Sequence, residues 1–185
     1  FVRTADGGLA GIADLVNRGR ELAIQSSNGT LNDSQRQTWN KEFGQIQSKI
    51  DRLTGSLQFN GRNLLDGTLE QNADSVNIQA GTGSGPDNQI SRNVVESTST
   101  KNLEIADSDI STTQGALQAI DSFERASQAL HAAWRQVGAI GNRLTSTANS
   151  LNIQIENLTR SESGLADTDL AEEISNLQQG LLRFE

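Results

Sequence analysis

The sequence predicts a mainly α protein, built as an elongated bundle of long antiparallel helices with coiled-coil-like seams and a small β-hairpin region. The strongest indication is a stripe of apolar residues that steps by threes and fours from Leu117 to Leu158 without a proline. A second stripe of the same kind runs from Trp39 to Leu57. Hydrophobic residues make up 34% of the chain and aromatic residues 4%, which suits narrow seams between helices better than a thick core.

The first helix is expected to begin near Asp6, where Thr4 and Asp6 are cap-type residues. It is expected to end at the turn pair Asn28-Gly29, because glycine suits a C-terminal cap. Its apolar face contains Leu9, Ile12, Leu15 or Val16, Gly19, Leu22 and Ala23.

A second helix is expected to begin after residues 31–34 and to end at Gly55 and the turn 59–61. Its apolar residues repeat at alternating spacings of four and three, which matches the long stripe in kind. The seam of this helix contains Trp39, Phe43, Ile46, Ile50, Leu53 and Leu57.

The middle of the chain, from about residue 66 to 111, is rich in Gly, Ser, Thr, Asn and Asp and holds the only proline, Pro86. Alternating apolar and polar residues at 75–79 and 90–94 flank the loop 81–87, which predicts a β-hairpin. Residues 103–105 are expected to add a short strand.

A long helix is expected from Thr113 to Arg160, followed by an acidic turn at 161–169 and a last helix from near Thr168 to the end. At 1.5 Å per residue the long stripe would span roughly 60 Å, so the chain is expected to be a rod. We expect one domain over 1–185, with an N-terminal half (1–65), a connecting region (66–112) and a C-terminal half (113–185). The seam expected on the long helix is Leu117, Ile120, Phe123, Ser127, Leu130, Trp134, Val137, Gly141, Leu144, Ala148, Leu151, Ile155 and Leu158.

The composition argues against several classes of function. The net charge of −8 argues against nucleic acid or an anionic membrane as a partner. The chain has no cysteine, which excludes disulfides and thiol catalysis, and no apolar run long enough to cross a membrane. It also has no methionine, even at position 1, so we expect it to be a fragment of a longer protein.

The sequence shows no set of residues for catalysis. The only histidine, His131, lies beside the seam, and its neighbours at helical spacing include no good metal ligand. No serine elbow and no glycine-rich phosphate loop is present. The acidic residues around Asp167 and Asp169 are better explained as the start of a helix than as calcium ligands. We therefore expect no enzyme activity, no metal and no cofactor.

Several blocks of the sequence, in order along nearly the whole chain, resemble bacterial flagellin. The blocks of the N-terminal half are 17–30 (NRGRELAIQSSNGT), Glu42, 50–53 (IDRL) and 58–61 (QFNG). Those of the C-terminal half are 137–144 (VGAIGNRL), 166–169 (ADTD) and 172–175 (EEIS). Gly141 departs from the family pattern, which usually has glutamine there.

The resemblance implies the core helical-bundle domain of a short flagellin, without the outer variable domains and truncated at both termini. It implies a structural subunit that assembles into the flagellar filament for motility, outside the cell after secretion by the flagellar export apparatus. Other flagellin subunits would be its partners, together with export chaperone and cap proteins.

The resemblance also implies recognition by the flagellin-sensing Toll-like receptor, with contacts matched to Arg18, Leu22 and Glu42. The alternative for these residues is that Arg18 and Glu42 are solvated charges and Leu22 belongs to the core. The alternative for the whole chain is a cell-surface adhesin or a glycan-binding flagellin-like protein, in which Trp39 and Trp134 would stack on sugars.

Overall fold

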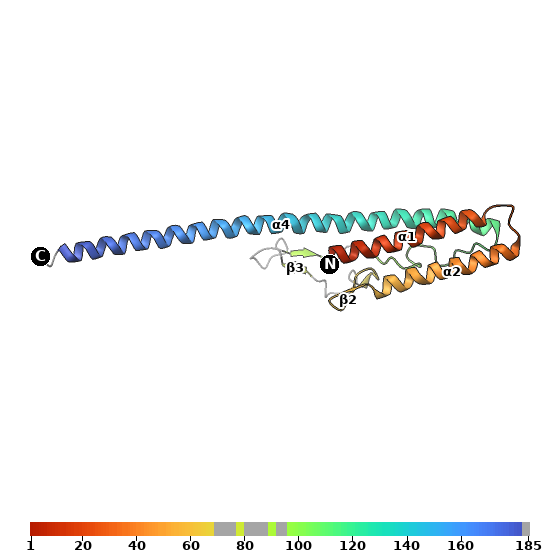
Figure 1. The fold of residues 1–185 in the computed structure, drawn as a ribbon, viewed down its shortest axis with the longest axis horizontal. Coiled ribbons are helices and arrows are strands. Elements are labelled where there is room, and N and C mark those ends of the chain that lie inside the picture. The colour runs from red at the N-terminus through yellow and green to blue at the C-terminus, as the bar shows by residue number, and fades with distance from the viewer. Residues whose placement is uncertain (69–76, 80–88, 92–95, 183–185) are drawn as a thin grey trace.

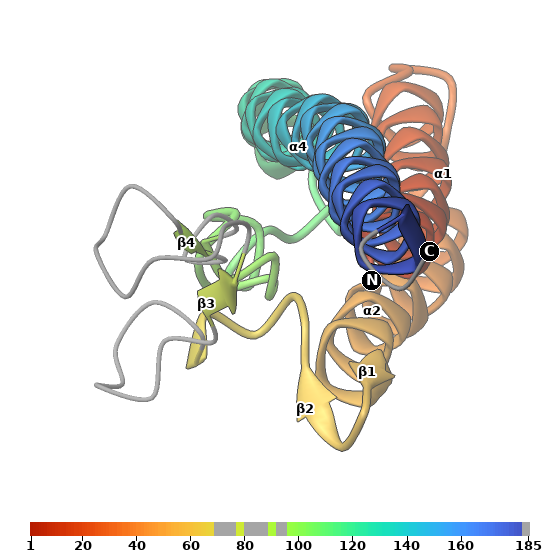
Figure 2. The same ribbon diagram turned by 90° about the vertical axis from the view of Figure 1, so that its left-hand side faces the viewer.

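The computed structural model describes residues 1–68, 77–79, 89–91 and 96–182, with side chains of the last stretch described up to Leu165 and at Ile174. Most of the described chain is helical, in α1 (Val2–Ser26), α2 (Asp33–Ser56) and α4 (Thr113–Leu182). α1 packs against both of the others and runs antiparallel to them, as Figures 1 and 2 show. The mainly α, elongated fold that the sequence predicts is therefore confirmed.

α1 begins four residues earlier than the sequence predicts, because Phe1 is its N-cap and makes no side-chain cap hydrogen bond. Asp6 is inside the helix, where its Oδ1 accepts a hydrogen bond from Trp134 Nε1 at 2.8 Å. The helix ends at Ser26, and its C-cap Ser27 keeps a right-handed conformation with φ −68°. Gly29 is not in the left-handed region, so the predicted glycine cap is wrong.

α2 begins with a complete capping box. Asn32 Oδ1 accepts from Gln35 N at 2.9 Å, and Gln35 Oε1 accepts from Asn32 N at 3.0 Å, which satisfies two backbone donors at the helix start. The helix ends where the backbone of Leu57 becomes extended. A tight hairpin follows, formed by β1 (Gln58–Phe59) and β2 (Arg62–Asn63).

α4 is one continuous helix of 70 residues, about 105 Å long at the α-helical rise. The predicted turn at 161–169 and the separate last helix are wrong. This segment contains Gly164 but no proline, and one glycine in a helix costs only about 1 kcal/mol. Figure 1 shows the second half of α4 extending beyond the ends of α1 and α2.

The buried face of α4 differs from the predicted seam at every second position. Ile120, Ser127, Trp134 and Gly141 are only half-buried, and Leu117 is 54% exposed. The residues one place earlier are buried instead, and most are alanines, whose small side chains allow α1 to approach closely. The buried positions are Ala116, Ala119, Phe123, Ala126, Leu130, Ala133, Val137 and Ile140.

The connecting segment contains the predicted β-hairpin in part. β3 (Asn77–Gln79) and β4 (Gln89–Ser91) pair antiparallel, with Ile78 opposite Ile90. The predicted strand positions 75–76 and 92–94, and the loop 81–87, lie outside the described residues. Residues 103–105 form a turn and not a strand, with Glu104 at φ 57° and both Leu103 and Ile105 buried.

Candidate functional site: surfaces for assembly

The second half of α4 carries an exposed apolar stripe. Leu144, Leu151, Leu158 and Leu165 continue the seven-residue repeat of the buried Val137, so they lie on one face of the helix. Burial falls along this repeat from 2% exposed at Val137 to half-buried at Leu144 and Leu151, then to 69% and 68% exposed at Leu158 and Leu165. Ile155 flanks the stripe and is 61% exposed.

This stripe resembles one side of a coiled-coil seam whose partner helix is missing from the described chain. In the bundle, the same repeat packs against α1. Past the start of α1, which lies beside Gly141, no other helix of the described chain runs alongside α4, as Figure 1 shows. Contiguous exposed leucines and isoleucines mark surfaces that bind another protein segment. The stripe is therefore the best candidate for an assembly surface.

The predicted seam residues are distributed over three environments. The ones in the bundle interior are Phe43, Ile46, Ile50, Leu130 and Val137. Trp39, Leu53 and Trp134 are partly buried and pack against that core. Leu144, Leu151 and Ile155 lie on the extended half of α4, where Ile155 is exposed and so is not part of a seam within this chain.

The three residues matched to a receptor contact lie in two different environments, the surface and the core. Arg18 Nη2 lies 2.9 Å from Glu42 Oε1, and Arg18 Nη1 lies 3.3 Å from Glu21 Oε2. The hydrogen bonds to Glu42 and then to Glu21 raise the pKa of Arg18, so it stays charged. Leu22 is fully buried. The structure thus brings Arg18 and Glu42 together on the surface and places Leu22 in the core.

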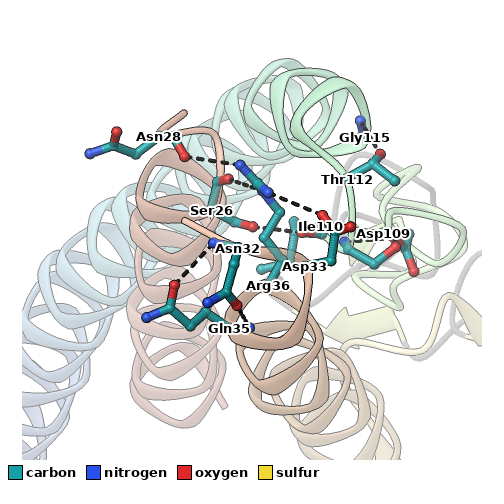
Figure 3. Close-up of polar contacts among 11 residues, drawn as sticks. Ser26, Asn28, Asn32, Asp33, Gln35, Arg36, Asp109, Ile110, Thr112 and Gly115 are labelled. Atoms are coloured by element: carbon teal, nitrogen blue, oxygen red, sulfur yellow. Dashed lines mark hydrogen bonds and ion pairs between the residues drawn. The ribbon is translucent and has the colours of Figure 1, made fainter. Parts of the chain in front are cut away.

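Arg36 is important for the structure, although no apolar stripe or matched block of the sequence includes it. Arg36 is only 6% exposed, and its guanidinium lies at the end of the bundle where α1 meets α2 (Figure 3). Arg36 Nε donates to Ser26 O at 3.1 Å and Nη2 donates to Asn28 O at 3.1 Å. These two carbonyls belong to the end of α1 and the turn after it, so Arg36 takes the cap role expected of Gly29. One feature of the sequence could have indicated this role. Arg36 follows Asp33 by three residues, so it lies in the first turn of the helix that Asn32 and Gln35 begin.

The residues to consider for metal binding and for stacking on sugars are His131, Trp39 and Trp134. Within them, no three His, Cys, Asp or Glu side chains gather where they could hold a metal ion. The ring of His131 stacks on Trp134 at a centroid distance of 5.8 Å, and the indole of Trp134 also contacts the core. In the described part of the chain no helix is both long enough and apolar enough to cross a lipid bilayer.

The fold and the stripe define a class of protein: an elongated helical bundle whose longest helix exposes an apolar repeat. Residues 1–70 match the family model of the bacterial flagellin N-terminal helical region, and residues 117–182 match that of the C-terminal helical region. The chain belongs to the bacterial flagellin family.

Relatives and solved structures agree with this assignment. A flagellin of Halalkalibacterium halodurans is 34% identical over 94% of this chain, and the flagellar filament 30.7 kDa core protein of Treponema maltophilum is 32% identical over 94%. The chain spans 62% and 64% of the length of these two relatives. The crystal structure of Bacillus cereus flagellin superposes with a TM-score of 0.69 at 28% identity, covering 80% of this chain and 82% of that one. FliC from Burkholderia pseudomallei shares the fold, with a TM-score of 0.57 at 19% identity over 77% of this chain and 98% of that one.

Proposed function

We propose that this chain is a structural subunit of the bacterial flagellar filament and assembles with other copies into a helical tube. The observation that carries the proposal is the apolar repeat of α4 that continues past the bundle without a partner in the described chain. Contacts between different faces of identical subunits do not close on themselves, and so they produce open filaments. The names of the relatives, flagellin and flagellar filament core protein, favour the same function.

The energetics of the stripe suit assembly. Burying one leucine or isoleucine side chain contributes about 1.5–3 kcal/mol. Because Ile155, Leu158 and Leu165 are 61%, 69% and 68% exposed, together they offer roughly 3–6 kcal/mol, before the loss of translational and rotational freedom on association is subtracted. This burial free energy is too small to hold two subunits together by itself. It stabilises an assembly when many subunits each contribute it, as they do in a polymer.

The test is the double variant Leu158→Gln and Leu165→Gln in the full-length protein, with polymerisation followed by sedimentation and electron microscopy. We expect the variant to stay unpolymerised while its thermal unfolding is unchanged, because both side chains are exposed in the free subunit. The matched control is Ile153→Gln, since Ile153 is 58% exposed but lies on the opposite face of α4. Equal polymerisation of the stripe variant and the control would refute the role of the stripe.

The same proposal covers the finer expectations about the whole protein. It holds residues 1–185 to be one core domain, without enzyme activity, located in the filament outside the cell after export by the flagellar apparatus. Its partners are then other flagellin subunits, an export chaperone and the filament cap, with no nucleic acid or membrane contact. Family membership and the acidic net charge of −8 support these points.

A second candidate function is recognition by the flagellin-sensing Toll-like receptor. The observation that favours it is the exposed Arg18–Glu42 pair, which presents one positive and one negative group side by side across α1 and α2. We expect Arg18→Ala and Glu42→Ala to weaken signalling in a receptor reporter cell. Arg20→Ala is the control, because Arg20 pairs with Glu124 on α4 instead. Signalling of both variants at the level of the control would remove this candidate.

A further inference from the structure

Two asparagine-glycine pairs occur in the chain, Asn28-Gly29 and Asn60-Gly61. In such a pair the backbone nitrogen of glycine can attack the side-chain carbonyl carbon of asparagine, because glycine has no side chain to hinder the approach. The structure places the two pairs in very different environments, so it distinguishes their reactivity.

The side chain of Asn28 is held as an activated carbonyl. Its Oδ1 accepts two hydrogen bonds, from Thr30 N at 3.1 Å and from Thr30 Oγ1 at 3.1 Å. Both donors stabilise the negative charge that develops on Oδ1 when a nucleophile attacks Cγ. No described residue pairs with Nδ2 of Asn28, which leaves this nitrogen free to depart as ammonia. Figure 3 shows the side chain pointing away from Arg36 while the backbone carbonyl of Asn28 faces it.

The same chain shows the product geometry elsewhere. In Asp66-Gly67-Thr68, Thr68 N donates to Asp66 Oδ1 at 3.0 Å and Thr68 Oγ1 donates to the same oxygen at 2.7 Å. Residues 28–30 have the same side-chain contacts with an amide in place of the carboxylate, although Gly67 has φ 78° and Gly29 is not in the left-handed region. A carboxylate at position 28 therefore fits the existing contacts, and its hydrogen bonds are stronger because they are charge-assisted.

We propose that Asn28 is a modification site, where spontaneous deamidation converts the asparagine to aspartate or isoaspartate. The nitrogen of Gly29 bonds to Cγ of Asn28, the Cγ–Nδ2 bond breaks, and ammonia leaves with the proton of the Gly29 amide. Water then opens the cyclic imide at either of its two carbonyls, so that asparagine and water yield aspartate or isoaspartate together with ammonia, without any redox step. Each event adds one negative charge to a chain of net charge −8, at the end of the bundle beside Arg36.

Asn60-Gly61 is the unreactive counterpart. Asn60 has φ 53° and Gly61 has φ 74°, the paired left-handed conformations of a type I′ turn between β1 and β2. The cyclic imide contains the Cα–C bond of the asparagine and so fixes its ψ angle. Ring closure at Asn60 therefore requires the turn that pairs Phe59 with Arg62 to open, whereas ring closure at Asn28 turns a carbonyl that accepts from Arg36 Nη2 and Leu31 N but opens no strand pair. Among the described residues none donates a hydrogen bond to the side chain of Asn60.

The test follows both sites in one sample of the folded protein. Deamidation raises the peptide mass by about 1 Da, and trypsin separates the sites into the peptides 21–36 and 53–62. Fragment spectra assign the change to Asn28 and not to Asn32 in the first peptide. We expect Asn28 to convert faster than Asn60, and faster as the pH rises, because the attacking nitrogen of Gly29 must lose its proton.

Two controls separate the effect of the fold from that of the sequence. In urea the two sites are expected to react at similar rates. Thr30→Val removes one donor to Oδ1 and is expected to slow Asn28 about tenfold in the folded protein, while leaving Asn60 unchanged. Faster or equal conversion at Asn60 in the folded protein would overturn the proposal. So would a ratio of the two rates that is the same in buffer and in urea, or a Thr30→Val variant as fast as the wild type.

Discussion

At the scale of single residues, the end of the bundle depends on a buried charge. Arg36 satisfies the carbonyls of Ser26 and Asn28 and lies 3.4 Å from Asp33 Oδ1. The hydroxyl of Ser26 in turn donates to Ile110 O at 2.6 Å. This network joins α1, α2 and the segment before α4. It needs several N–H donors in one plane, and among the amino acids only arginine has such a group.

Arg36→Ala is expected to lower the free energy of unfolding by about 2–3 kcal/mol, because the buried carbonyl of Ser26 loses a charged donor and the partly buried carbonyl of Asn28 keeps only the weaker bond from Leu31 N. Urea unfolding followed by circular dichroism measures it. Arg52→Ala is the control on the same helix, since Arg52 is exposed, and should change stability by no more than about 0.5 kcal/mol. Similar effects of the two substitutions would show that the network contributes little.

Glycine at position 19 is required by close packing. A Cβ atom there would lie 2.2 Å from Cε1 of Phe123, and the ring of Phe123 is itself fixed against Phe43 at a centroid distance of 5.1 Å. Gly19→Ala is expected to destabilise the protein by about 1–3 kcal/mol through overpacking. A Cβ at Gly44 meets nothing within 4 Å, so Gly44→Ala should stabilise by about 0.5–1 kcal/mol. Thermal unfolding of both variants tests the pair, and a shift of the same sign in both would contradict this account.

At the scale of elements, the connecting segment is held to the bundle by side-chain hydrogen bonds. Asp109 Oδ2 accepts from Asn40 Nδ2 at 2.8 Å, and Asn40 Oδ1 accepts from Ile110 N at 2.9 Å. Asp51 Oδ1 accepts from both the backbone nitrogen and the hydroxyl of Thr100. Polar residues thus help to fix a segment that also packs Leu103, Ile105 and Ile110 into the core.

The anchoring by Asp109 should depend on pH. The hydrogen bond from the Ser111 hydroxyl lowers the pKa of Asp109 most, partial burial opposes it, and the Ser111 backbone and Asn40 lower the pKa further. The stability from this group is therefore complete above the ordinary carboxyl pKa and is lost as the pH falls through the lower folded value. Ser111→Ala should be less stable than the wild type at neutral pH, and this difference should shrink in acid.

Urea unfolding at neutral pH and below about pH 3 measures the difference for Ser111→Ala. The control is Ser48→Ala, because the hydroxyl of Ser48 donates to Gly44 O of its own helix and to no carboxylate. The prediction fails if the Ser111→Ala deficit stays constant with pH.

α4 is one helix in geometry but two segments in stability. Its first half is covered by the bundle, whereas residues 152–165 are exposed all round. A helix that lacks packing is marginal in water. In the free chain we expect backbone amides after about Leu151 to exchange with deuterium at least about tenfold faster than those before Ile140. Assembly should protect them, and uniform exchange along α4 in the free chain would contradict the division.

At the scale of the whole molecule, the main consequence of the fold is that the chain is much longer than a compact protein of the same size. A compact globule of this size has a radius of gyration of about 16 Å. With α4 continuous over about 105 Å, we expect about 25–30 Å for the free chain by small-angle scattering. A value near the compact figure would mean that the second half of α4 folds back on the bundle in solution.

The α class, the position of α2 and the apolar character of α4 could be predicted from the sequence. The α class and the end of α2 depend on local signals, namely the 3-4 spacing and the Asn60-Gly61 turn, whereas contacts with α1 shift the buried face of α4 one place away from the predicted stripe. Family membership was recognisable for the same reason, since the matched blocks are contiguous in the chain.

The tertiary structure alone decided the rest. Alanine is apolar enough to be buried but too small to be identified by pattern, so only the contact with α1 reveals Ala119, Ala126 and Ala133 as the seam in place of Ile120, Ser127 and Trp134. Arg36 could not be identified as a cap because its acceptors belong to another helix. Whether a leucine of the repeat is core or assembly surface depends on where α1 begins, beside Gly141, and not on the repeat itself. A local pattern determines which face of a helix is apolar, but only the packing of distant segments determines where that face is covered.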